Sequence, residues 1–73
     1  MLTEREMVSW RDPYGRVVAR VLQGVRLKDG RPVAVYYAEV AGVGKEPRDR
    51  YTCAVKAVNI TLRQRNIVAT PNM

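Results

Sequence analysis

An Asp-Gly pair in the first half of the chain is the feature that most limits the fold. Residues 28–31 read Lys-Asp-Gly-Arg and lie between two valine-rich runs, 16–27 and 33–40. Asp-Gly tolerates the positive φ angles that a tight hairpin turn needs, and β-branched residues on both sides favour strands. The sequence therefore predicts a β-hairpin. Pro32, which lacks an N–H donor, suits the entry of the second strand.

A short helix is expected before this hairpin, at residues 3–10. Thr3 and Glu6 match a capping box, in which each side chain accepts from a backbone N–H of the first turn. Met7 and Trp10 lie three residues apart and continue an apolar stripe. A helix of this length is not stable alone, so we expect it to pack on the rest of the fold.

Further strands are expected after the hairpin. A loop at residues 41–49 leads to a third predicted strand at residues 50–59, because apolar residues recur there at every second position. The face of this strand would hold Tyr51, Cys53, Val55 and Ala57. Residues 60–62 and 66–70 are interpreted as two more short strands, joined by a tight turn at residues 63–65.

Together these elements predict a mainly β fold in a single small domain, residues 1–73. The helix would occupy residues 3–10, and a strongly bent five-stranded barrel of the SH3-like or Sm-like kind would occupy residues 16–70. A meander this short is not expected to form two separate packed sheets. Gly24 and Asn59 are expected to provide the bends.

The composition excludes several kinds of chemistry. The chain has no histidine and one cysteine, so a histidine triad, a histidine general base and a Cys–His zinc site are excluded. No nucleophile is placed beside a base, and we expect no enzyme activity, cofactor or metal. The unpaired Cys53, expected in the core, indicates a reducing cytoplasm. No apolar run reaches the length of a membrane span.

The charge balance indicates an acidic partner. The chain holds 13 Lys and Arg against 7 Asp and Glu, for a formal net charge of +6. A basic domain of this kind is typical of proteins that bind nucleic acid or another polyanion. The alternative is a charged surface that only keeps the protein soluble.

Two segments resemble the signatures of the Sm-like family of small β-barrels. Residues 60–71 are similar to the second signature, in which apolar residues flank an Arg-Gly-x-Asn turn, with Gln64 at the glycine position. Residues 27–33 are similar to the first signature, a strand followed by an Asp-Gly hairpin. The resemblance implies a homo-oligomeric ring that binds single-stranded RNA at its pore, with Arg63 and Asn66 near the bound base.

The candidate nucleic-acid-binding residues form two groups. Guanidinium groups that grip phosphates and amides that bond base edges occur together in the predicted turn, at Arg63, Gln64, Arg65 and Asn66. A second group would form a basic stripe along the first strand of the hairpin, at Arg16, Arg20, Arg26 and Lys28. The alternatives are a solvated polar turn and an edge strand whose charges prevent pairing.

The tyrosines allow two interpretations. Tyr36, Tyr37 and Tyr51 lie on predicted strands of a basic chain, where aromatic rings can stack on unpaired bases. The chain has no phenylalanine, however, so tyrosines and Trp10 must supply the aromatic core. We therefore expect most of them to be buried.

These observations predict a non-catalytic nucleic-acid-binding protein, with single-stranded RNA favoured by the Sm-like resemblance and with self-association. The alternative is a protein–protein interaction module with an acidic partner, such as a small phage or mobile-element accessory protein. Salt dependence separates the two, because nucleic-acid binding weakens steeply as salt rises and an apolar contact does not.

Overall fold

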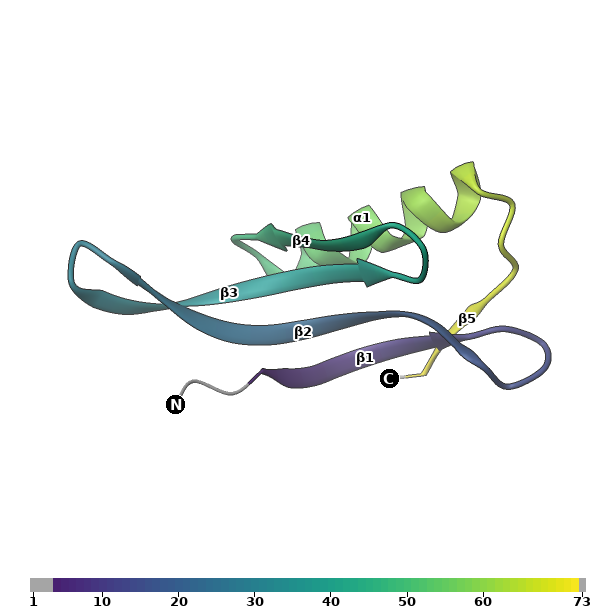
Figure 1. The fold of residues 1–73 in the computed structure, drawn as a ribbon, viewed down its shortest axis with the longest axis horizontal. Coiled ribbons are helices and arrows are strands. Elements are labelled where there is room, and N and C mark those ends of the chain that lie inside the picture. Colours follow the sequence, from purple (N-terminus) through teal and green to yellow (C-terminus); the bar gives the residue numbers. More distant parts are fainter. Residues whose placement is uncertain (1–3, 73) are drawn as a thin grey trace.

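The computed structural model describes residues 4–72, which form one antiparallel sheet of five strands and a single helix (Figure 1). The elements are, in chain order, β1 (Arg5–Arg11), β2 (Val17–Lys28), β3 (Arg31–Val40), β4 (Gly44–Arg48), α1 (Tyr51–Gln64) and β5 (Thr70–Asn72). The strand order is β4-β3-β2-β1-β5, so β4 and β5 are the edge strands. The predicted mainly β class, with five strands and one short helix, is confirmed. The helix lies elsewhere in the chain than predicted.

The Asp-Gly hairpin forms as predicted and provides the central strands of the sheet. Lys28 pairs with Arg31, which leaves Asp29 and Gly30 as a two-residue turn between β2 and β3. Their φ angles are 53° and 78°, and two successive positive values are typical of a type I′ turn. The twist of this turn matches the twist of the strands, so β2 and β3 pair without a register shift.

The outer part of this hairpin projects as a two-stranded arm, which we define as residues 25–34 (Figure 1). β1 pairs with β2 only as far as Gln23, and β4 pairs with β3 only as far as Tyr36. The strands of the arm therefore pair only with each other among the described residues. All arm residues except Val33 are exposed, and the molecule is elongated, with extents of 42 × 21 × 20 Å.

The N-terminal helix predicted at residues 3–10 is wrong, because Arg5–Arg11 forms β1. Val8 and Trp10 lie two residues apart and are 2% and 1% exposed, which is the periodicity of a strand. Pairing with β2 satisfies the backbone of β1, whereas a helix this short would need other support. Thr3, the predicted cap, lies outside the described residues.

The strand predicted at residues 50–59 is also wrong, because Tyr51–Gln64 forms α1. Ala54, Val58 and Leu62 recur every four residues and are buried, so they form the apolar stripe of a helix. The sheet needs a cover for one apolar face, and this stripe provides it.

The remaining C-terminal predictions change with the helix. Residues 60–62 belong to α1, and of the strand predicted at residues 66–70 only Thr70 lies in a strand. Cys53, predicted in the core, is exposed. The two predicted bends also differ, because Asn59 lies within α1 and Gly24 pairs with Val35 in regular register.

The residues after α1 end the helix by a Schellman arrangement. Asn66 has a φ of 56°, in the left-handed region. Its N–H donates to the Arg63 carbonyl at 3.2 Å, and the Ile67 N–H donates to the Leu62 carbonyl at 2.9 Å. Ile67 also packs against the core cluster that contains Leu62. These are the two hydrogen bonds and the apolar contact of the motif.

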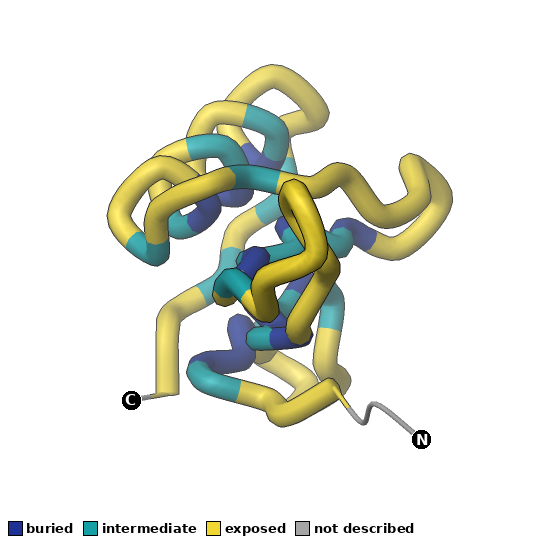
Figure 2. The backbone as a smooth tube through the Cα atoms, turned by 90° about the vertical axis from the view of Figure 1, so that its left-hand side faces the viewer, coloured by how far each residue is buried: buried dark blue, intermediate teal, exposed yellow. Residues whose placement is uncertain are grey.

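The core lies between α1 and the sheet (Figure 2). The sheet contributes buried residues from three strands to this cluster, namely Val8, Trp10, Ala19, Val21, Ala38 and Val40. Leu22 and Val35 are buried on the other face of the sheet. There an added Cβ on Gly24 would come within 3.1 Å of Tyr37 Cε2, so the glycine lets this ring lie against the strand.

The left-handed conformation of Asn66 yields a test of the helix end. We expect Asn66→Val to lower the free energy of unfolding by about 1–2 kcal/mol, because a β-branched residue is strained at positive φ. Asn66→Gly should change it by less than about 0.5 kcal/mol, because glycine adopts this conformation freely. Urea unfolding of both variants measures the difference. Equal losses would show that the side chain of Asn66, rather than its backbone conformation, holds the helix end.

Candidate nucleic-acid interface

The acidic residues of the protein are almost all engaged in ion pairs with basic residues. Six of the seven have a basic partner within 4.0 Å, and only Asp29 in the hairpin turn has none among residues 4–72. The pairs are Arg16–Asp12, Arg20–Glu6, Arg20–Glu39, Arg26–Asp49, Lys45–Glu4 and Arg48–Glu46. Carboxylates therefore neutralise five basic residues locally, namely Arg16, Arg20, Arg26, Lys45 and Arg48.

Two of these pairs, on the face of the sheet away from α1, raise the pKa of their basic residue. The hydrogen bond from Arg20 Nε to Glu39 raises the pKa of Arg20. The hydrogen bond from Lys45 Nζ to Glu4, at 2.6 Å, raises the pKa of Lys45 above its ordinary value of 10.5. Lys45 Nζ also lies 4.9 Å from the centre of the Tyr37 ring, in a cation–π contact.

α1 and its flanks carry positive charge without any acidic residue. The segment 50–66 contains Arg50, Lys56, Arg63 and Arg65 and no Asp or Glu. The first turn of the helix holds no acidic residue, and Asp49, which directly precedes the segment, contacts Arg26. Of the eight basic residues in the described part of the chain that have no carboxylate within 4.0 Å, four therefore lie in this segment. The other four are Arg5, Arg11, Lys28 and Arg31.

A row of polar side chains runs along the outer face of α1. Thr52, Lys56, Asn59 and Arg63 are spaced by four, three and four residues, which places them on one side of a helix. All four are exposed. They line a shallow hollow on the helix surface together with Tyr51, Val55 and Ile60. We call these four residues the helix row.

A hydrogen bond from the core fixes the position of Asn59 in the helix row. Trp10 Nε1 donates to Asn59 Oδ1 at 3.2 Å, and the Trp10 ring is buried in the core at 1% exposure. The amide NH₂ of Asn59 is the group left for other acceptors, because its oxygen already accepts this bond. A fixed amide donor between two cations suits hydrogen bonding to a phosphate or a base edge.

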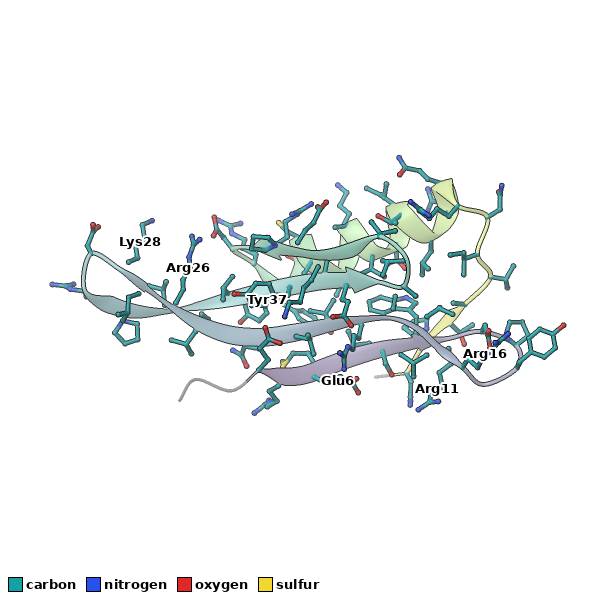
Figure 3. The ribbon with its side chains drawn as sticks, in the orientation of Figure 1. Glu6, Arg11, Arg16, Arg26, Lys28 and Tyr37 are labelled. Atoms are coloured by element: carbon teal, nitrogen blue, oxygen red, sulfur yellow. The ribbon has the colours of Figure 1, made fainter. Side chains whose placement is uncertain are left out.

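The arm carries a second set of basic groups. Lys28 pairs with Arg31 in the sheet register, so their side chains share one face of the arm, and Arg26 lies on that face two residues before Lys28. Arg26 contacts Asp49, just before α1, at 3.4 Å. Figure 3 shows Arg26 and Lys28 on the arm, at the opposite end of the molecule from Arg11 and Arg16.

The predicted turn group lies at the C-terminal end of α1. Arg63 and Gln64 belong to its last turn, Arg65 is the C-cap and Asn66 follows in the left-handed conformation. The prediction of a turn between two strands at these residues is therefore wrong, although all four side chains are exposed. Asn66 acts in ending the helix.

The predicted basic stripe is interrupted. Arg16 lies in the turn before β2, Arg20 lies in the middle of the sheet, and both are bound to carboxylates. The structure brings Arg26 and Lys28 together on the arm and separates them from the turn group by the length of α1 (Figure 1).

Four residues that sequence reasoning missed are Arg31, Thr52, Lys56 and Asn59. Arg31 could have been found from the hairpin turn, which places it opposite Lys28. Lys56 and Asn59 could have been found from their spacing to Thr52 and Arg63, in a stretch without acids, if the segment had been recognised as a helix.

The tyrosines pack within the protein rather than forming an open platform. The Tyr36 and Tyr51 rings meet edge to face with centroids 6.0 Å apart, and both are half-buried. Tyr37 is half-buried beside Lys45. The expectation that most tyrosines are buried is therefore met only in part, because these three pack against neighbours but stay half-buried, and Tyr14 is 85% exposed.

Within residues 4–72, no group of three or more His, Cys, Asp or Glu side chains is placed to hold a metal ion. None of the described residues forms a helix that is long and apolar enough to span a membrane.

Comparison with known proteins finds no match among protein-family models, curated proteins or solved structures. The Sm-like relationship therefore stays a prediction.

The Glu4–Lys45 pair yields a test of the charge arrangement on the sheet. We expect Glu4→Gln to lower the pKa of Lys45, because the hydrogen bond from this carboxylate raises it. The pKa of Lys45 is higher in the folded protein than in the unfolded chain. The stabilisation that the Glu4–Lys45 pair gives the fold is therefore complete below pH 10.5 and is lost as the pH rises through the folded pKa. An NMR titration of the Lys45 Cε shift measures this. Glu46→Gln is the matched control, since Glu46 binds Arg48; an unchanged Lys45 pKa in Glu4→Gln would contradict the pairing.

Proposed function

We propose that this protein binds nucleic acid and catalyses no reaction on it. The observation that carries the proposal is the separation of charge between the sheet and α1. Residues 50–66 hold four basic and no acidic residues, whereas the rest of the chain holds nine basic and seven acidic residues. The segment of α1 and its two caps therefore carries +4 of the net charge of +6, which is the distribution expected of a surface that tracks a phosphate backbone.

The helix row gives this surface its chemistry. Lys56 and Arg63 neutralise phosphates and release the counterions that were bound there. Thr52 lies beside Lys56, and Asn59 lies between Lys56 and Arg63. Both donate hydrogen bonds to phosphate oxygens or base edges. α1 has 14 residues and is about 21 Å long at 1.5 Å per residue, so the row can contact several successive phosphates.

The absence of a catalytic step is part of the proposal for two reasons. The sequence contains no histidine, and six of the seven carboxylates are bound to Lys or Arg. A carboxylate held by a cation is a weak general base, because the cation favours its ionised form.

The form of nucleic acid and the assembly were first expected from the Sm-like resemblance. Single-stranded RNA and a homo-oligomeric ring both stay predictions. The residues similar to the second signature, 60–71, form the end of α1, the segment after it and the start of β5. The alternative partner is an acidic protein. The salt dependence of oligonucleotide binding separates the two, because binding to nucleic acid weakens steeply as salt rises.

A pair of double variants tests the proposal. We expect Lys56→Ala with Arg63→Ala to weaken binding and to flatten the slope of log K against log salt by about 2, because two phosphate contacts are lost. Fluorescence anisotropy with labelled single-stranded RNA and duplex DNA, from low to physiological salt, measures both quantities. Arg11→Ala with Arg16→Ala is the matched control, because it removes the same charge at a site far from α1 and should leave the slope nearly unchanged.

Two results would contradict the proposal. If the wild-type protein binds neither oligonucleotide at low salt, it is not a nucleic-acid-binding protein. If both double variants lose the same affinity and slope, the total charge matters and α1 is not the binding surface.

A further inference from the structure

The arm has a shape and a charge distribution that fit one kind of nucleic acid. We infer that the arm enters the major groove of B-form duplex DNA while α1 follows the adjacent backbone. This inference rests on the proposed function and names its ligand.

The dimensions of the arm match the groove. Two paired strands lie about 4.8 Å apart, and a major groove about 12 Å wide admits a two-stranded β-ribbon. The arm contains four residue pairs between β2 and β3, from Val25–Ala34 to Lys28–Arg31. At about 3.3 Å per residue, four pairs extend about 13 Å, which exceeds the groove depth of about 8.5 Å. The arm is therefore long enough to reach base edges.

Both faces of the arm carry groups that the groove can use. Lys28 and Arg31, on one face, have no acidic partner within the described part of the chain and can bind phosphates or the O6 and N7 atoms of guanine. The opposite face exposes Leu27 at 69% and Val25 at 38%. Apolar side chains of this kind contact the methyl groups of thymine, which lie in the same groove.

The position of the arm relative to α1 makes one continuous surface. Arg26 at the base of the arm contacts Asp49 at 3.4 Å, and Arg50 and α1 follow directly. Figure 3 shows Arg26 and Lys28 at the end of the molecule where α1 begins. The Arg26–Asp49 pair is exposed and therefore weak, so Arg26 can exchange this carboxylate for a phosphate at small cost.

Other nucleic acids fit the arm less well. The major groove of an RNA duplex is deep and too narrow for protein side chains to read. Single strands are bound through aromatic rings that stack on bases, and residues 25–34 contain no aromatic residue. The nearest rings, Tyr36 and Tyr37, are half-buried in the sheet.

Three duplexes of one sequence test the inference. The first is unmodified DNA of about 24 base pairs, roughly twice the length that a 42 Å molecule covers at 3.4 Å per base pair. The second is the same DNA with glucosylated 5-hydroxymethylcytosine, whose sugars fill the major groove. The third is the corresponding RNA duplex. We expect the wild-type protein to bind the unmodified DNA about tenfold or more tightly than the other two, because the arm is excluded from them.

The arm variant Lys28→Ala with Arg31→Ala should bind all three duplexes alike, at the affinity of the wild-type protein for RNA. Arg11→Ala with Arg16→Ala loses the same charge at the other end of the molecule and should keep the preference for unmodified DNA. Circular dichroism of each variant verifies the fold, and the wild-type comparison of the three duplexes is informative without any variant.

The outcomes separate the inference from the proposed function. If the wild-type protein binds all three duplexes equally, the arm does not enter the major groove, although the protein binds nucleic acid. If single-stranded RNA binds more tightly than any duplex, the inference is also overturned. If no duplex and no single strand binds, both the inference and the proposed function fail.

Discussion

The packing of one apolar stripe of α1 on the sheet is the interaction on which the rest of the structure depends. Ala54 and Val58 are fully buried and Leu62 is 4% exposed, so these three residues fix the rotation of the helix about its axis. Once they face the sheet, helical geometry turns Lys56 and Arg63 toward solvent. The same stripe covers Trp10, whose indole N–H then holds Asn59. The basic surface is therefore a geometric consequence of how the core is packed.

The sequence predicts the β-hairpin well and the helix poorly, for identifiable reasons. The hairpin depends on a turn whose two residues have few alternative conformations, so a local signal is sufficient. α1 lacks the usual signals of a helix start, because Arg50 at the N-cap makes no side-chain hydrogen bond and the first turn has no acidic residue. Its apolar residues fit periods of two and of about four equally well. The choice between them is made by the uncovered face of the sheet, which is a tertiary effect.

The candidate site shows the same division between local and tertiary information. The excess of basic residues is visible in the sequence, and Arg63 and Lys28 are recognised as candidates from it. The sequence does not predict which basic residues form ion pairs. Arg20 contacts Glu39, and Lys45 contacts Glu4, only because of the sheet register and the path of the chain. Lys56 and Asn59 become neighbours of Arg63 only when the segment is helical.

The two halves of β2 belong to different cooperative units. From Ala19 to Gln23 the strand has β1 on one side and β3 on the other, and the side chains of Ala19, Val21 and Leu22 are buried. From Val25 to Lys28 its only partner among residues 4–72 is β3, and an isolated two-stranded hairpin is marginally stable in water. Backbone amides at the two ends of one continuous strand therefore exchange their hydrogens by different routes. Those of the core half exchange through global unfolding, and those of the arm through a local opening that leaves the domain folded.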